Sequence, residues 1–253
     1  DQNNNLSSII NSKAIRSTIK ILNNNKILER IQKMDEDILY DQQHIDFLEE
    51  IWGDGFLSPG GRDEVARVLN GVQIEGKRIL DIGCGTGACA ALLATEYGAG
   101  YVTGIDVEDP VCEAAIKRFN NKGLSDKVLV IKVEPGTFPF DTASFDVVFS
   151  KSFIEHFYYP EKIIAEIYRV LKPNGLVITM APDWKYGITS FHEDFTHRTA
   201  FTLQSLNDIH KISHFRNVIT ERFIQLPIIW KIPFLKFITI LIDTKCVVHF
   251  NNS

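Results

Sequence analysis

Short apolar runs and longer amphipathic stretches alternate through the middle of the chain. The runs are typical of buried strands, and the first two lie at residues 79–82 and 101–105. Stretches between them carry apolar residues at helical spacing, at 62–69, 88–94 and 160–171. Strands that alternate with helices in this way predict an α/β fold with a parallel sheet.

The two ends of the chain follow different patterns. After a predicted helix at 202–211, strands are expected at 217–224 and 244–250. The first thirty or so residues place isoleucines at roughly helical spacing, and a second helix begins near Asp35 and ends at Gly53. We therefore expect residues 1–55 to form a helical extension, either a cap or an arm, and residues 56–253 to form the main domain.

The run Ile79–Gly87 joins a strand to a glycine-rich turn, and Ala88–Ala94 continues it as a helix. This order of elements cradles the phosphate or nucleoside part of a ligand at a helix N-terminus. Glycine permits positive φ and a close approach of the ligand to the backbone. Since Gly83-x-Gly85-x-x-Ala88 also fits the dinucleotide fingerprint, neighbouring residues must indicate which ligand binds.

Two acidic residues favour one nucleoside ligand. Asp81 lies two residues before the first glycine, where a carboxylate would repel a pyrophosphate but attract the ammonium group of S-adenosylmethionine (SAM). Asp106 ends the next apolar run, where an acidic side chain can accept both ribose hydroxyls. NAD and SAM share that ribose, so Asp81 makes the distinction.

With these motifs the chain resembles the class I SAM-dependent methyltransferases. The resemblance continues through Val128–Val133, Ser144–Ser150, Ser152–Phe157 and Leu171–Thr179, and it covers about residues 56–181. It implies that Val128–Val133 is the third strand, that Ser144–Ser150 is the fourth, and that Leu171–Thr179 is the turn into the fifth. It implies a doubly wound, Rossmann-like sheet of seven strands in the order 3-2-1-4-5-7-6, in which the last strands form an antiparallel hairpin. It implies SAM as the cofactor and a small molecule as the substrate.

The resemblance also assigns the cofactor contacts. Asp81 would hold the ammonium, the glycine turn the adjacent backbone, Asp106 the ribose, and Glu134 the adenine at a position where the family usually has Asp. The cofactor-binding residues expected on this basis are Ser58, Gly60, Asp81, Gly83, Cys84, Gly85, Gly87, Asp106, Val107, Glu134, Pro135 and Ser150.

The stretch Trp52–Gly61 is rich in glycine and turn-forming residues, which predicts a loop. Ser58 and the backbone amides near Gly60 could reach a carboxylate. A similar stretch precedes the SAM turn in phosphoethanolamine methyltransferases, where it covers the cofactor. The alternative is an ordinary turn between two helices.

Polar and aromatic side chains gather in the loop Asp183–Arg198, which leaves the fifth strand at the edge where such sheets bind ligands. We take His192, Asp194 and His197 as candidate catalytic residues, together with His156 after the fourth strand. The alternative is that these side chains cap helices and brace loops. Two imidazoles and one carboxylate lack further ligands, so no metal site is expected.

The composition bears on whether the protein binds nucleic acid and on where in the cell it is expected. The net charge of −5 offers no electrostatic footprint for nucleic acid. Four cysteines show no Cys-x-x-Cys spacing, and the asparagine-rich opening lacks the apolar stretch of a signal peptide, so a cytoplasmic location is expected. Residues 226–242 are apolar but contain two prolines and two lysines, which argues against a transmembrane helix. This segment would be buried in the core, form a homodimer contact, or touch a membrane surface.

The function that these observations favour is SAM-dependent methyl transfer to a small-molecule acceptor such as a metabolite, sugar or lipid headgroup. A non-catalytic SAM-binding protein is the alternative from a different class. An NAD-dependent oxidoreductase would not explain Asp81. A nucleic-acid methyltransferase is disfavoured by the charge and by Ser150–Phe153, which stands where amino-base methylases carry an Asn/Asp-Pro-Pro-Tyr type of motif.

Overall fold

The computed structural model describes residues 40–187, 191–192, 194–224 and 244–252. Contacts divide the chain into two units, Asp1–Asp41 and Gln42–Ser253, and the second unit is described here. The expected division at residue 55, which concerns the roles of the two parts, stays a prediction. The predicted helix near the N-terminus and the apolar segment 226–242 lie outside the described residues.

Helices and strands alternate along this unit. The helices are α4 (Gln42–Trp52), α5 (Gly61–Val68), α6 (Ala88–Thr95), α7 (Asp109–Lys122), the short 3₁₀ helix η1 (Ile154–His156), α8 (Pro160–Val170) and α9 (Leu203–Ile212). The strands are β1 (Arg78–Ile82), β2 (Tyr101–Asp106), β3 (Val128–Lys132), β4 (Phe145–Lys151), β5 (Leu171–Pro182), β6 (Arg216–Ile224) and β7 (Thr244–Asn252).

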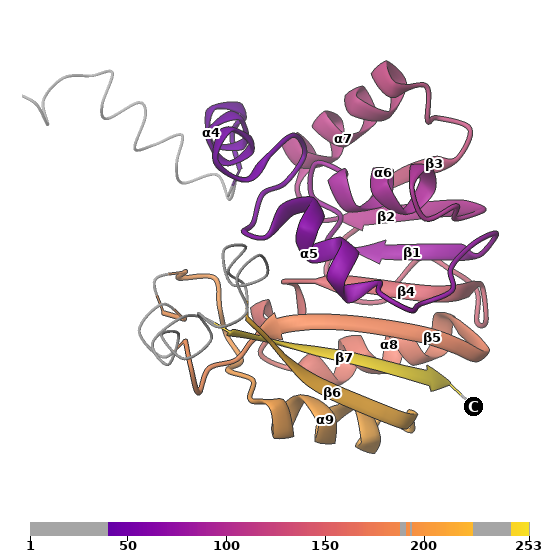
Figure 1. The fold of residues 1–253 in the computed structure, drawn as a ribbon, viewed down its shortest axis with the longest axis vertical. Helices are drawn as coiled ribbons and strands as arrows, with labels where there is room; N and C mark the ends of the chain where they lie inside the picture. Colours follow the sequence, from indigo (N-terminus) through magenta and orange to yellow (C-terminus); the bar gives the residue numbers. More distant parts are fainter. Residues whose placement is uncertain (1–39, 188–190, 193, 225–243, 253) are drawn as a thin grey trace, which may run out of the picture. The chain divides into compact units, whose positions relative to one another are not determined.

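The strands form one sheet in the order β3-β2-β1-β4-β5-β7-β6 (Figure 1). β3, β2, β1, β4 and β5 are parallel neighbours, whereas β7 pairs antiparallel with both β5 and β6. The predicted α/β, Rossmann-like fold and its parallel order 3-2-1-4-5 are confirmed. The carboxyl ends of β1, β2 and β4 lie at one edge of the sheet, where doubly wound folds bind their ligands.

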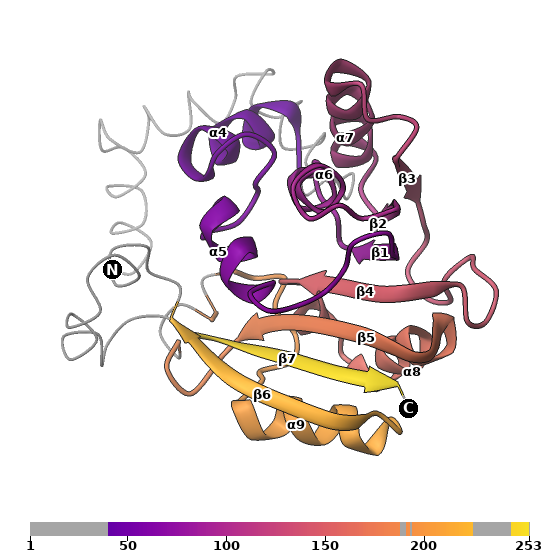
Figure 2. The ribbon, with the colours of Figure 1, turned by 45° about the vertical axis from the view of Figure 1, so that its right-hand side comes forward.

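Helices cover both faces of this sheet, because successive strand residues point to opposite sides. Ile79 belongs to the core beneath α5, α6 and α7, while the next residue, Leu80, belongs to the core beneath α8 and α9. Both side chains are fully buried. Figure 2 shows the two helical layers on either side of the strands. Burial on both faces explains why the strands appear in the sequence as continuous apolar runs.

Local signals in the sequence account for several helix boundaries. α7 has Pro110 in its first turn and ends at Gly123, which adopts a left-handed conformation with φ 64°. α9 begins with a capping box, in which the Thr202 side chain accepts a hydrogen bond from the Ser205 backbone and the Ser205 side chain accepts one from the Thr202 backbone. No helix among the described residues is long and apolar enough to cross a membrane.

Candidate functional site

The glycine turn lies between β1 and α6 at the carboxyl edge of the sheet. Gly83 has φ 68° and Gly87, the N-cap of α6, has φ 89°. A Cβ atom on Gly83 would lie 2.8 Å from the Phe153 ring, and one on Gly87 would lie 2.4 Å from the Phe119 ring. Both positions therefore require glycine for the backbone conformation and for packing within the protein.

Asp81 is buried beside this turn with one oxygen free. Its side chain is 2% exposed, and its Oδ2 atom has no hydrogen-bond partner in the structure. Burial and the nearby Asp106 carboxylate raise its pKa to about 8, although the Lys151 ammonium opposes the shift. A cationic group from a ligand would satisfy the free oxygen and stabilise the ionised form. This is the environment that an ammonium group of SAM would complete.

Asp106 connects the second strand to the glycine turn. Its Oδ2 atom accepts a hydrogen bond from the Gly85 backbone N–H at 2.9 Å, and its Oδ1 atom accepts bonds from the Val107 and Glu108 backbone N–H groups. Burial raises the pKa of Asp106, and these three donors only partly offset that effect. Asp106 therefore has two tasks: it holds the turn, and its remaining lone pairs are available to ribose hydroxyls.

A pocket opens next to Asp106. It is lined by Ile105, Asp106, Val107, Val133, Glu134, Pro135, Gly136, Phe138, Phe153, Phe157 and Ile163. Val107, Glu134 and Pro135 are exposed, whereas Phe138 is buried below them. An apolar lining of this kind suits a flat heterocycle such as adenine, and Glu134 adds one carboxylate at its rim. Three of the residues expected at the adenine and ribose therefore share this pocket with Asp106.

A buried ion pair joins α5 to the end of β4. Lys151 Nζ lies 3.0 Å from Glu64 Oε2, and these side chains are 6% and 0% exposed. Lys151 Nζ also donates a hydrogen bond to Ser58 Oγ. The sequence analysis anticipated Ser58 but missed Lys151 and Glu64, because the pair joins residues distant in sequence. Ser150, also expected at the cofactor, has a fully buried hydroxyl without a hydrogen-bond partner.

A second polar network connects α4 to the glycine turn through α7. The Arg118 guanidinium contacts both Glu49 oxygens at 2.7 and 2.8 Å and Asp54 at 2.9 Å. It also donates to the Thr86 backbone carbonyl, while the Thr86 hydroxyl donates to Glu49 at 2.8 Å. Lys122 forms a more exposed ion pair with Asp54. The loop Trp52–Gly61 is therefore fastened at both ends beside the cofactor residues.

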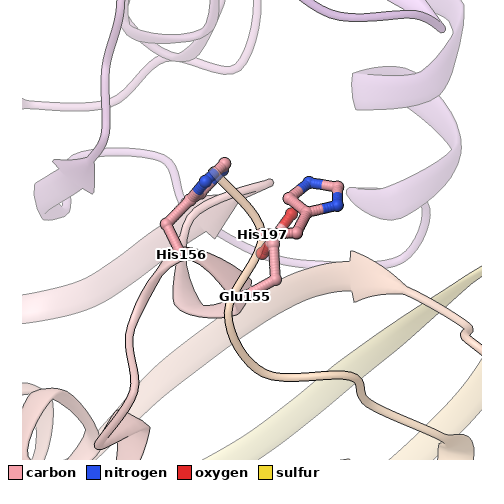
Figure 3. Close-up of side chains that lie close together, drawn as sticks. All are labelled: Glu155, His156 and His197. Carbon is pink, nitrogen blue, oxygen red and sulfur yellow. The ribbon is translucent and has the colours of Figure 1, made fainter. Parts of the chain in front are cut away.

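Two of the candidate catalytic histidines, His156 and His197, lie next to each other. His156 lies at the end of η1 and His197 in the loop that follows β5, with their ring centroids 5.0 Å apart (Figure 3). His156 Nδ1 lies 2.8 Å from Thr196 Oγ1, and Thr196 Oγ1 donates a hydrogen bond to Asp194 Oδ1. His197 Nδ1 lies 2.8 Å from the Phe191 carbonyl. The structure thus brings His156, Asp194 and His197 together.

The ionisation of this cluster follows from its surroundings. Burial lowers the pKa of His156 below its usual value, against the opposing effect of Asp194 and of the Thr196 and Ser152 backbones. Burial alone would raise the pKa of Asp194, but the hydrogen bonds from Thr196 and the electrostatic effect of His197 and His156 outweigh it and lower the pKa. At neutral pH the cluster therefore pairs a neutral imidazole with an ionised carboxylate.

Glu155 adds a buried carboxylate to the same place. Glu155, His156 and His197 have potential metal-ligand atoms within 4.8 Å of one another, and Figure 3 shows their side chains converging. A tetrahedral zinc site holds its ligand atoms about 3.4 Å apart. The Glu155 backbone carbonyl accepts hydrogen bonds from the N–H groups of Arg198 and Thr199, which ties the loop after β5 to η1. The expectation that the chain binds no metal stays a prediction.

The loop carries further polar residues outside this set of contacts: Asp183, His192 and Arg198. Asp183 is 1% exposed and pairs with Arg222 of β6 at 3.2 Å, which braces the start of the loop. His192 is exposed, with its ring against Phe191. Arg198 donates to the Phe195 carbonyl, and its guanidinium lies 5.4 Å from the centroid of the Tyr158 ring. Arg198 therefore supplies an exposed cation near His156.

The chain is a doubly wound α/β protein with a glycine turn and a buried carboxylate at the carboxyl edge of its sheet, and comparisons with known proteins give the family. Residues 80–179 match the family described as "Methyltransferase domain". The chain is 34% identical over 188 residues to phosphoethanolamine N-methyltransferase 2 of Caenorhabditis elegans, covering 72% of this chain and 43% of that protein. It is 28% identical to phosphoethanolamine N-methyltransferase of Plasmodium falciparum, covering 72% and 70% respectively.

A solved structure of a phosphoethanolamine N-methyltransferase is also similar to this chain. Phosphoethanolamine N-methyltransferase 2 of Haemonchus contortus, in complex with phosphomonomethylethanolamine and S-adenosylhomocysteine, superposes with a TM-score of 0.70 at 25% identity, covering 86% of this chain and 59% of that one. The chain spans half or less of the length of the curated relatives that head the comparison. It belongs to the class I SAM-dependent methyltransferases, and SAM is the cofactor of this family.

Proposed function

We propose that this chain transfers a methyl group from SAM to a small-molecule acceptor, and that an amine of the phosphoethanolamine type is the first acceptor to test. The observation that carries the proposal is the free buried oxygen of Asp81 in β1, beside the glycine turn, where a cationic group of a ligand would complete the site. The relatives named above act on phosphoethanolamine or bind its methylated form.

Different residues of the chain bind different parts of SAM. Asp81 binds the ammonium and the backbone of the glycine turn lies alongside. Lys151, Ser58 and the backbone near Gly60 bind the methionine carboxylate, since the buried Lys151 ammonium acts electrostatically on Asp81 and donates a hydrogen bond to Ser58. Asp106 binds the ribose, and the pocket rimmed by Glu134 receives the adenine.

SAM supplies an activated methyl group on a sulfonium, so the protein has to orient the acceptor and exclude water. His156 accepts the proton that the acceptor must lose, because its lowered pKa keeps the imidazole neutral at pH 7. The exposed Arg198 guanidinium is placed to attract an anionic group such as a phosphate on the acceptor.

We further propose that β6 and β7 complete the seven-strand order of the family.

Turnover of SAM to S-adenosylhomocysteine tests this proposal directly. The chain is incubated with SAM and phosphoethanolamine, and in parallel with a panel of amines, sugars and lipid headgroups. Turnover that depends on one acceptor, and that is abolished in His156→Ala while SAM still binds, supports methyl transfer. SAM binding without turnover on any acceptor of the panel favours a non-catalytic SAM-binding protein instead.

A further inference from the structure

The loop after β5 holds Asp194 in one position relative to Thr196. One carboxylate oxygen of Asp194 accepts hydrogen bonds from both the backbone N–H and the hydroxyl of Thr196, the backbone contact being 2.9 Å long. The Asp194 pKa is lowered, so at neutral pH this carboxylate can only accept hydrogen bonds. The single hydroxyl proton of Thr196 is therefore committed to Asp194.

Because the Thr196 hydroxyl donates to Asp194, it can only accept a hydrogen bond from His156. A hydroxyl that has donated its proton retains only lone pairs, so Thr196 Oγ1 accepts a hydrogen bond from His156 Nδ1 at 2.8 Å. Nδ1 of His156 must then carry the imidazole proton. In the neutral ring the other nitrogen, Nε2, keeps its lone pair and is the basic atom.

We propose that Asp194 and Thr196 act as a relay that fixes the proton of His156 on Nδ1 and so makes Nε2 the base that receives the acceptor's proton. This inference rests on the proposed function and deepens it. It makes Thr196 and Asp194 positioning residues, and it gives the loop after β5 a role in setting the protonation of a residue that follows β4.

Several charged and hydrogen-bonding groups surround His156. The charged and titratable groups around it are Asp194, Arg198, His197 and Glu155, and the Thr196 and Ser152 backbones also lie within hydrogen-bonding range. His197 Nδ1 meets the Phe191 carbonyl, which can only accept, so this imidazole also carries its proton on Nδ1. Its Nε2 atom lies 3.6 Å from Asp194 Oδ2. Asp194 therefore contacts both imidazoles, one directly and one through Thr196.

The tautomer of His156 can be measured without knowing the acceptor. The full chain is labelled with ¹⁵N-histidine, and long-range ¹H–¹⁵N correlation spectra at about pH 7.5, above the ordinary histidine pKa, identify which ring nitrogen is protonated. His156→Gln assigns the signal. We expect the neutral Nδ1–H form in the wild type, a shift towards Nε2–H in Thr196→Val, and the wild-type form in Thr196→Ser, which keeps the hydroxyl.

The outcomes separate the relay from the proposed function. A wild-type His156 with its proton on Nε2 overturns the relay whether or not any variant folds, and so does an unchanged tautomer in folded Thr196→Val. Zinc bound through His156 Nε2 in the purified chain would overturn the role of that atom as the base, since the ion would occupy the lone pair that receives the proton. SAM affinity should stay within threefold in both Thr196 variants. Loss of SAM binding in the wild type would instead overturn the proposed function and leave the tautomer result standing.

Discussion

Asp81 couples SAM binding to pH at the scale of a single residue. Its pKa of about 8 means that the free protein holds a proton on this carboxyl below that pH, whereas pairing with an ammonium requires the ionised form. SAM affinity should therefore rise with pH up to about 8, with a limiting slope of roughly tenfold per unit. Titration calorimetry at several pH values measures it, and Asp81→Asn, which cannot ionise, should lose the slope. An equal slope in that variant would contradict the assignment.

Lys151 permits a separation of structural and ligand-binding roles. Lys151→Met leaves Glu64 buried without its cation and should lower the melting temperature strongly. The double variant Lys151→Met/Glu64→Gln removes the pair together and should recover most of that stability. SAM affinity should remain about tenfold weaker in the double variant, the scale of one charge-assisted hydrogen bond. Full recovery of SAM binding would show that Lys151 only supports the fold.

How far the sequence predicts the site depends on how local each contact is. The sequence predicts Asp81, Asp106 and the glycines as cofactor residues because each lies at or directly after the end of an apolar run. Lys151, Glu64 and Thr196 are not predicted, because their partners lie far away in the chain: Lys151 reaches Ser58, and Thr196 reaches His156. Asp183 lay within the expected substrate loop, but its ion pair with Arg222 depends on a strand that follows much later.

At the scale of elements, Arg118 of α7 fastens α4 and the following loop to the glycine turn. Removing it in Arg118→Ala leaves Glu49, whose side chain is 20% exposed, without its cation, and releases the Thr86 carbonyl of the turn. We expect a lower melting temperature and SAM affinity weaker by roughly tenfold or more. Thermal unfolding and SAM titration measure both effects.

The matched control is Lys122→Ala, which removes an ion pair to the same loop residue, Asp54. The side chains of Lys122 and Asp54 are 46% and 64% exposed, and an ion pair this exposed contributes about 0.5 kcal/mol or less to the free energy of unfolding. Stability and SAM affinity should therefore change little. Similar losses in both variants would mean that any change near this loop is harmful and that Arg118 has no special part in holding it.

Element positions followed from the sequence more closely than their contacts did. The helix expected at 160–171 is α8 (Pro160–Val170), and the helix expected at 202–211 is α9 (Leu203–Ile212), since proline and a capping threonine mark their starts. The loop after β5 was recognised as polar, but which of its side chains meet His156 depends on the Glu155 carbonyl, which holds that loop in place. A backbone hydrogen bond of this kind does not depend on side-chain identity, so the sequence does not predict it.

At the scale of the whole molecule, His210 makes unfolding sensitive to acid. Burial lowers its pKa to about 4, while in the unfolded chain it is near 6.5, so the unfolded state binds more protons between these values. Stability should fall as pH decreases through this window, by an amount on the order of 3 kcal/mol for this residue. His210→Gln, which cannot ionise, should reduce that pH dependence in denaturant unfolding. An unchanged dependence would contradict a neutral buried imidazole.

The central claim is that the free oxygen of Asp81 and the glycine turn bind SAM. Titration calorimetry of SAM, with NADH as the competing nucleoside ligand, tests it on the full chain. The account predicts one SAM bound per chain, no measurable binding of NADH, and affinity for SAM weakened by roughly a hundredfold in Asp81→Ala with the fold intact. Undiminished SAM affinity in a folded Asp81→Ala, or tighter binding of NADH than of SAM, would contradict it.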